Sequence, residues 1–146
     1  MTRYLVDTNV VSTGAPIRSA RQPDVIRWMD QHSDDLFLSA ISVAEIVDGI
    51  AKLKRGGARR KAADLSAWLQ TLLHLYGERI LAFDASTAEV AGALSDLARG
   101  RGHAPGLADV IIAATAKRND FVILSRNQRH FRPMGVPVID PFEQLP

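Results

Sequence analysis

The stretch that decides the fold is Tyr4-Leu5-Val6-Asp7-Thr8-Asn9, an apolar run of strand length that ends in an acid. Two further acids stand at the edges of apolar elements: Glu45 follows Phe37-Leu38-Ser39-Ala40, and Asp109 precedes Val110-Ile111-Ile112-Ala113-Ala114. An unpaired carboxylate beside a buried strand carries a large desolvation cost. Three such acids in one crevice would repel one another unless a cation neutralised them. Because hard divalent ions prefer oxygen ligands, the pattern predicts a Mg²⁺ or Mn²⁺ site at Asp7, Glu45 and Asp109.

Apolar runs of strand length alternate with stretches of helical spacing along the chain. The expected strands are Tyr4–Val6, Leu36–Leu38, Ile80–Phe83, Phe121–Leu124 and Val136–Ile139. The expected helices are Pro23–His32, Ser42–Lys54, Ala58–Tyr76, Ser86–Arg99 and Leu107–Lys117, and the last is apolar almost all round and should be the most buried. The alternation predicts an α/β fold with a parallel sheet covered by helices on both faces. Sites in open sheets of this kind form outside the carboxyl ends of the strands, where Asp7 stands.

The composition is that of one folded domain over residues 1–146. A hydrophobic content of 47% and a charged content of 23% are ordinary for a globular protein, so disorder is not expected. No apolar run approaches the roughly 18 residues of a membrane helix, and we expect neither a membrane anchor nor a targeting segment. The absence of cysteine excludes disulfides and thiolate metal sites. It suits a reducing compartment, so the expected location is the cytoplasm.

Basic residues gather in one acid-free segment, although the net charge is only +2. This basic tip consists of Lys52, Lys54, Arg55, Arg59, Arg60 and Lys61. Such a cluster raises the local electrostatic potential and attracts a phosphate backbone. On charge alone, a solvated tip between two helices is the simpler explanation, and both interpretations stay open.

Each of the three acids also has a purely structural interpretation. Asp7 would cap the turn that follows it. Glu45 would close a capping box with Ser42, a signature that recurs at Ser86-Thr87-Ala88-Glu89. Asp109 would complement the dipole of the helix that it opens. A cap explains each acid singly, whereas a bound cation explains all three together.

Polar side chains also follow the fourth expected strand, at Ser125-Arg126-Asn127. Ser125 and Asn127, with Asn9 as a further accessory residue, would offer neutral oxygens to the metal or its water ligands. Arg126 would meet a phosphate. The alternative is a simple turn cap followed by a surface arginine.

With these residues assembled, the chain resembles a PIN-domain ribonuclease, specifically a VapC-like toxin of type II toxin–antitoxin modules. The resemblance covers essentially the whole chain in order. It rests on residues 5–9, 39–46, 107–116 and 124–131 and on the tail at 135–142. It implies a single-domain, three-layer α/β/α PIN-like fold with a five-stranded parallel sheet.

The resemblance also implies an activity, which is Mg²⁺- or Mn²⁺-dependent hydrolysis of RNA phosphodiester bonds. Asp7, Asp109 and Glu45 would be the acidic ligands, and Glu45 would hold the attacking water or act as general base. It further implies a homodimer and a cognate antitoxin whose tail occupies the acidic crevice. The RNA backbone would be contacted by Arg126 and by four residues of the basic tip: Lys54, Arg55, Arg59 and Arg60.

Two positions depart from the family pattern and keep other functions open. Asn127 stands where a fourth acid is common, and His130 replaces an acid of the Arg-Asn-x-x-Asp-Phe pattern. Both changes reduce the negative charge of the pocket and disfavour a second ion. The histidines lack the paired spacing of zinc sites, so we expect His103 and His130 to contact a phosphate rather than a metal.

Two alternative functions follow from these departures and from the strand–Asp start. One is a non-catalytic or weakly active PIN-like module that binds RNA or a partner. The other is a haloacid-dehalogenase-like phosphatase, although that pattern requires a second acid where Asn9 stands. A nucleotide-binding domain is disfavoured because neither glycine-rich phosphate motif is present.

Overall fold

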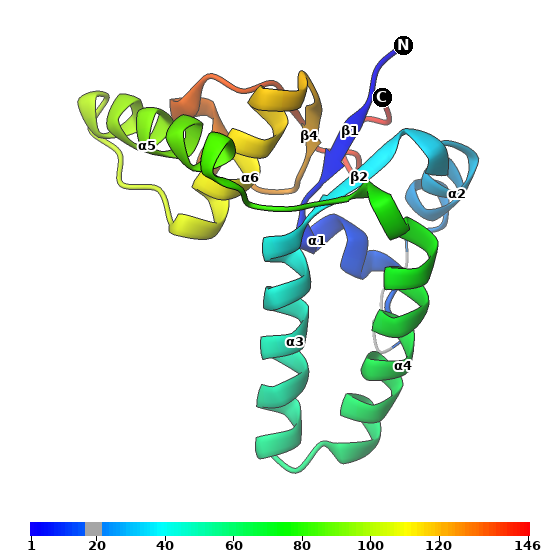
Figure 1. The fold of residues 1–146 in the computed structure, drawn as a ribbon. Coiled ribbons are helices and arrows are strands. Elements are labelled where there is room, and N and C mark those ends of the chain that lie inside the picture. The colour runs from blue at the N-terminus through cyan, green and yellow to red at the C-terminus, as the bar shows by residue number, and fades with distance from the viewer. Residues whose placement is uncertain (17–21) are drawn as a thin grey trace.

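Strands and helices alternate from one end of the chain to the other in the computed structural model, which describes residues 1–16 and 22–146 (Figure 1). The strands are β1 (Tyr4–Val6), β2 (Leu36–Ser39), β3 (Ile80–Leu81), β4 (Val122–Leu124) and β5 (Val138–Ile139). The helices are α1 (Thr8–Val11), α2 (Pro23–Gln31), α3 (Ala40–Arg55), α4 (Arg59–Tyr76), α5 (Ala85–Gly100), α6 (Leu107–Asn119) and α7 (Gln128–Phe131).

The five strands form one sheet in the order β3-β2-β1-β4-β5, and every neighbouring pair is parallel. β1 lies in the centre, with Leu5 opposite Phe37 of β2 on one side and Ile123 of β4 on the other. The chain leaves β1 for β2 on one flank and later returns to β4 on the other. In open sheets of this kind, sites form beside such a reversal, here at the carboxyl ends of β1 and β4, and we call this region the crevice. The predicted α/β fold with a five-stranded parallel sheet is therefore confirmed.

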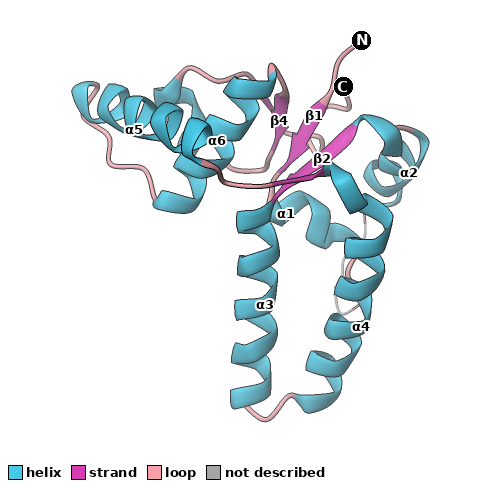
Figure 2. Cartoon of the chain, in the orientation of Figure 1, coloured by secondary structure: helices cyan, strands magenta, loops and turns pink. Residues whose placement is uncertain are grey.

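Successive residues of β1 point to opposite faces of the sheet, as the pleat requires. Leu5 packs with residues of α5 and α6, including Leu94 and Ile112, in one core cluster. Val6 packs with residues of α1, α2 and α4, including Trp28 and Leu69, in a second cluster. The helices therefore cover both faces of the sheet and make three layers (Figure 2).

Helix α6 is the most deeply buried helix, as its sequence predicts. Every residue from Val110 to Ala116 is buried, and the helix contacts β1, β2 and β4 as well as α5. Burying one large aliphatic side chain contributes about 1.5–3 kcal/mol, so this helix anchors its face of the sheet. Asp109 is thereby fixed at the rigid, amino-terminal end of α6.

Helices α3 and α4 form an antiparallel hairpin that projects away from the sheet and carries the basic tip at its far end (Figure 1). The turn falls at Gly56-Gly57, as predicted, and Gly57 has a φ of 88°, which favours glycine. None of the described helices has both the length and the apolar content that a membrane span requires.

Edge strands and one helix start differ from the sequence prediction. β3 ends at Leu81 rather than Phe83, whose side chain is exposed, and β5 begins at Val138 rather than Val136. Pro137 has no N–H to donate to a neighbouring strand, which delays the start of β5. Helix α3 begins at Ala40, two residues before the predicted Ser42, because the Ser39 side chain accepts the N–H of Ile41 and caps it.

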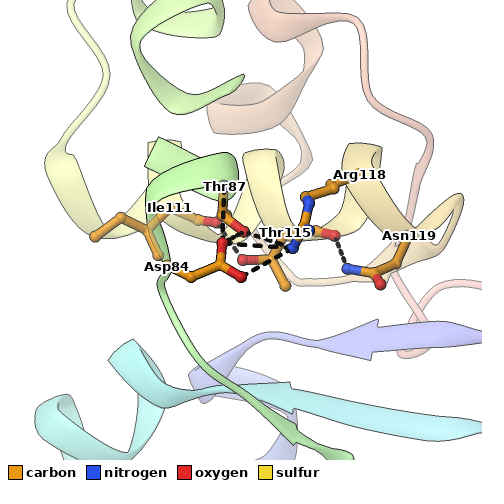
Figure 3. Close-up of polar contacts among 6 residues, drawn as sticks. All are labelled: Asp84, Thr87, Ile111, Thr115, Arg118 and Asn119. Atoms are coloured by element: carbon orange, nitrogen blue, oxygen red, sulfur yellow. Dashed lines mark hydrogen bonds and ion pairs between the residues drawn. The ribbon is translucent and has the colours of Figure 1, made fainter. Parts of the chain in front are cut away.

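Asp84, not Ser86, caps the start of α5, so the predicted capping box at Ser86–Glu89 is wrong. The Asp84 carboxylate accepts hydrogen bonds from the backbone N–H (2.9 Å) and hydroxyl (2.7 Å) of Thr87, and Arg118 of α6 pairs with it at 3.2 Å. Figure 3 shows this cluster joining the start of α5 to the end of α6. Aspartate is among the strongest N-cap residues, and Asp84 stands two residues before Ser86, so the helix begins there.

Candidate active site

Asp7 lies at the end of β1 and is only 5% exposed. One of its oxygens accepts the backbone N–H of Thr8 at 2.8 Å, so Asp7 caps helix α1 as the structural interpretation predicts. The other oxygen accepts the hydroxyl hydrogen of the buried Ser125 at 2.7 Å. Because Ser125 follows β4, this bond joins the carboxyl ends of the two central strands. Asp7 therefore sits in the crevice that the sheet topology creates.

The electrostatic environment of Asp7 opposes its negative charge. Burial raises the pKa of its carboxyl above the ordinary value of 3.8, and the charges of Asp109 and Glu45 raise that pKa further. The hydrogen bonds from Ser125 and Thr8 act in the opposite direction without reversing the shift. Among the described residues, no basic side chain forms a salt bridge with Asp7. The carboxylate is thus buried with two acids acting on it and no protein cation to balance them.

Glu45 lies on α3 and reaches towards the end of β1. Its Oε1 accepts the hydroxyl hydrogen of Thr8 at 2.8 Å, and the Thr8 hydroxyl also lies 2.9 Å from the Oγ of Ser42. The predicted capping box of Ser42 and Glu45 is wrong, because Ser39 caps this helix and Ser42 lies within its first turn. Glu45 is therefore free of a capping role and stands next to the residue that follows Asp7.

Asp109 opens α6, and its Oδ2 lies 3.0 Å from the Nδ1 of His130. His130 belongs to the short helix α7. From the sequence, His130 replaces an acid of the family pattern and was expected to contact a phosphate; its contact with Asp109 was not predicted. An imidazole beside Asp109 adds a hydrogen-bond donor where the family often has another carboxylate. Of the residues in this region, His130 is the main one whose contact could not be predicted from the sequence.

The three accessory residues bind one another around Asp7. The Nδ2 of Asn9 lies 3.4 Å from Asp7 Oδ2 and 3.5 Å from Ser125 Oγ, and its Oδ1 accepts the N–H of Arg126 at 3.2 Å. The N–H of Asn127 donates to Ser125 Oγ at 2.9 Å. The Ser125 hydroxyl is therefore occupied by protein partners, and it positions Asp7 rather than pointing into solvent.

The predicted RNA-binding residues do not gather at this crevice. Arg126 adjoins it, but its exposed guanidinium stacks on the Phe142 ring at 4.6 Å from the ring centre. Lys54 and Arg55 end α3, and Arg59 and Arg60 begin α4; all four are exposed. At about 1.5 Å per helical residue, Arg55 lies roughly 15 Å beyond Glu45 along α3. The basic tip is a separate surface from the acidic crevice.

The donor chemistry of the crevice fits a hard divalent cation, since its carboxylates are oxygen ligands acting on one another. Within residues 1–16 and 22–146, however, no three acidic, histidine or cysteine side chains are grouped closely enough to hold a metal as they stand. Glu45 is held by Thr8 and Asp109 by His130. The ligand set of Asp7, Glu45 and Asp109 stays a prediction, and it requires these two acids to exchange partners when an ion binds.

Residues 4–135 match the sequence profile of the PIN domain, and the chain belongs to the PIN-domain family. It is similar to the toxin FitB of Neisseria gonorrhoeae, with 34% identity over 139 residues, 94% of this chain and 97% of the relative. It is also similar to the VapC ribonuclease Y4jK of Sinorhizobium fredii, with 32% identity over 142 residues, 95% of this chain and 97% of the relative. The resemblance to VapC-like toxins stated from the sequence is thereby confirmed.

Solved structures agree with these relatives. The structure of FitAcB from Neisseria gonorrhoeae matches with a TM-score of 0.83 and 35% identity, over 95% of this chain and 98% of that chain. A structure of FitAB bound to a DNA fragment matches with a TM-score of 0.82 and 34% identity, over 95% of both chains. A DNA-bound VapBC from Salmonella typhimurium, at 19% identity and a TM-score of 0.76 over 96% of this chain and 98% of that chain, supports the fold alone.

Proposed function

We propose that this protein is a divalent-metal-dependent endoribonuclease, the toxin of a toxin–antitoxin pair, and that it acts on RNA in the cytoplasm. The observation that carries the proposal is the state of Asp7. It is a buried carboxylate at the topological switch point, and burial, Asp109 and Glu45 all raise its pKa. Clustered acids without a cation destabilise a fold, so their presence favours a function that needs them.

The side chains around the crevice have distinct roles in this proposal. A divalent ion, when bound by Asp7, Asp109 and Glu45, supplies the charge that activates water and stabilises the phosphoryl oxygens. Ser125 holds Asp7 in place by its hydrogen bond, and Asn9 ties the ends of β1 and β4 together. Glu45, next to Thr8, is exposed to solvent and is suited to accept a proton from water. Asn127 adds a neutral polar group and no charge.

RNA and protein partners are proposed from the charge pattern and from the relatives. The exposed basic tip and Arg126 would follow the RNA backbone, because arginine and lysine contacts to phosphate do not depend on base sequence. An antitoxin partner is proposed from the resemblance to toxin–antitoxin modules, and the similarity to the toxin FitB and to the FitAB structure supports it. We extend to this chain the homodimer that the family resemblance implies. The ribonuclease activity is supported by the similarity to the VapC ribonuclease Y4jK of Sinorhizobium fredii.

A second candidate function is a PIN module that binds RNA or a partner and has little or no turnover. The contact between His130 and Asp109 favours it, because this pairing engages one of the three proposed ligands. Membership of the PIN-domain family removes the phosphatase alternative. The two candidates that stay differ in whether the protein hydrolyses RNA.

Cleavage of total RNA by the purified protein tests the proposal. We expect cleavage in Mg²⁺ or Mn²⁺, none in excess chelator, and none by the Asp7→Asn variant in either metal. Asp84→Asn is the matched control, since it makes the same chemical change at an exposed cap and should cleave normally. Cleavage that persists in chelator would refute metal dependence. Binding of RNA without cleavage in either metal would support the second candidate instead.

A further inference from the structure

A small cavity opens beside Asp109, between the loop that precedes α6 and the start of α7. Its volume is about 200 Å³, and its polar lining consists of His103, Asp109, Arg129 and His130. The rest of the wall is small or cyclic, including Pro105 and Pro133. The residues come from two segments that are distant in sequence and that meet only because α7 packs against α6.

The polar lining of this cavity consists of one arginine, two histidines and the acid Asp109. The Asp109 carboxylate faces His130 Nδ1 at 3.0 Å, so its negative charge is directed to the imidazole. Among the described residues, Arg129 forms no salt bridge. A further guanidinium stands at the rim, because Arg101 donates to the carbonyl oxygen of Pro133 at 3.0 Å. The cavity and its rim therefore hold two guanidinium groups, those of Arg129 and Arg101, and one carboxylate, that of Asp109, which is already paired with His130.

We propose that this cavity is a subsite that binds a phosphate of the RNA strand next to the phosphate that is cleaved. Arg129 provides the charge and the N–H donors that hold the phosphate, and His103 lines the cavity beside it. The proposal rests on the ribonuclease function proposed above, to which it adds the path of the substrate: the strand passes over Asp109 and towards α7. It also gives His130 a role, since its imidazole pairs with Asp109 and stands where a carboxylate would repel the phosphate.

Size and polarity disfavour a whole nucleotide or an apolar ligand in this subsite. Pockets for drug-sized ligands are about 300–1,000 Å³, so a cavity of about 200 Å³ takes a phosphate group but not a whole nucleotide. An apolar ligand is disfavoured by the charged lining. The side chains of Asp109 and His130 are 24% and 40% exposed, so an anion reaches them directly from solvent.

The subsite is tested by RNA binding, measured in the Asp7→Asn background with Mg²⁺ present so that the RNA is not consumed. A short fluorescein-labelled single-stranded RNA of mixed sequence is titrated at several salt concentrations. Each phosphate contact in a single strand contributes about 0.7 to the slope of log K against log salt concentration. We expect Arg129→Ala to reduce this slope by about 0.7. Arg27→Ala, which removes the same charge from the exposed face of α2, should leave it unchanged.

A kinetic measurement in the wild-type background provides the second readout. Arg129→Ala should raise KM for RNA cleavage with a much smaller change in kcat, the pattern of lost ground-state binding. Equal salt slopes for Arg129→Ala and Arg27→Ala would overturn the subsite and leave the ribonuclease proposal intact. Reduced slope with no cleavage by the wild-type protein would support the subsite and overturn the ribonuclease. No RNA binding at all would overturn both.

Discussion

Two aspartates cap helices in this protein, and their surroundings are opposite. Asp84 caps α5 in solvent, where the Thr87 amide, the Thr87 hydroxyl and Arg118 hold its pKa below the ordinary value of 3.8. Asp7 caps α1 in a buried crevice, where burial and two further acids raise its pKa. The same residue type at the same cap position thus has a stabilised charged form at Asp84 and a destabilised charged form at Asp7.

The two aspartates differ in whether the protein itself supplies a positive partner. Asp84 finds its positive partner in Arg118 of the same chain, so its charge is balanced when the protein folds. Asp7 is surrounded by hydroxyl and amide groups and by other carboxylates. In the proposed function a divalent cation from outside the chain balances this charge, since such ions prefer oxygen ligands.

The largest expected effect comes from exchanging each aspartate for asparagine. Asp7→Asn should abolish detectable RNA cleavage, a loss of at least roughly a hundredfold, the scale of removing one electrostatic stabiliser from a site. Its melting temperature should equal or exceed that of the wild type, because a buried charge is removed. Asp84→Asn should show the reverse: normal cleavage and a lower melting temperature. If Asp7→Asn lowered the melting temperature as much as Asp84→Asn does, the proposed difference between the two aspartates would be contradicted.

Ser125→Ala removes the buried hydrogen bond to Asp7 without touching its charge. Leaving a buried polar group without its partner costs about 1–3 kcal/mol, and we expect a loss of unfolding free energy on that scale. The pKa of Asp7 should rise further, since this bond lowers it. Urea denaturation measures the first effect. Unfolding free energy equal to that of the wild type would contradict the contact.

The pH dependence of stability should differ in sign between the two aspartates. Asp84 binds its proton less tightly in the folded state, so its charge stabilises the fold above pH 3.8, and this contribution disappears as the pH falls through the lowered pKa. Asp7 binds its proton more tightly when folded. The wild type should therefore gain stability relative to Asp7→Asn as the pH falls from the raised pKa towards 3.8. Denaturant unfolding of both variants across acidic pH measures these differences.

The smallest expected effect belongs to Asn127→Asp. It restores an acid near Ser125, whose Oγ accepts the Asn127 N–H. An added carboxylate should tighten Mg²⁺ binding severalfold, which a calorimetric titration detects. An unchanged titration would mean that the side chain at this position does not face the crevice.

The sequence predicts the elements of this fold closely, because hydrophobic periodicity is a local property. Helix α4 starts one residue later than predicted and ends at the predicted Tyr76, and α6 is the buried helix that its composition indicates. Caps were predicted less well. The capping-box signature at Ser42 and at Ser86 describes residue types only, whereas Ser39 and Asp84 stand at the positions where the backbone leaves the extended conformation.

Contacts between distant segments could not be predicted from the sequence. Thr8 meets Glu45 across 37 positions, and Asp7 meets Ser125 across 118. The predicted gathering of polar residues at the strand ends followed from sheet topology, but the choice of partner depends on side-chain geometry. The only sequence signal for the pairing of Asp109 with His130 was the replacement of an acid by a histidine. The role that we propose for this histidine depends on the cavity beside it, which only the structure shows.

Thermal unfolding of the wild-type protein with and without Mg²⁺ or Mn²⁺ tests most directly whether the Asp7 crevice needs a cation. A ligand that binds only the folded state at a hundred times its Kd stabilises it by about 2.7 kcal/mol, so the melting temperature should rise with metal concentration. The rise should be lost in Asp7→Asn and kept in Asp84→Asn. A wild-type melting temperature that does not respond to either metal, or an equal response in Asp7→Asn, would contradict the account.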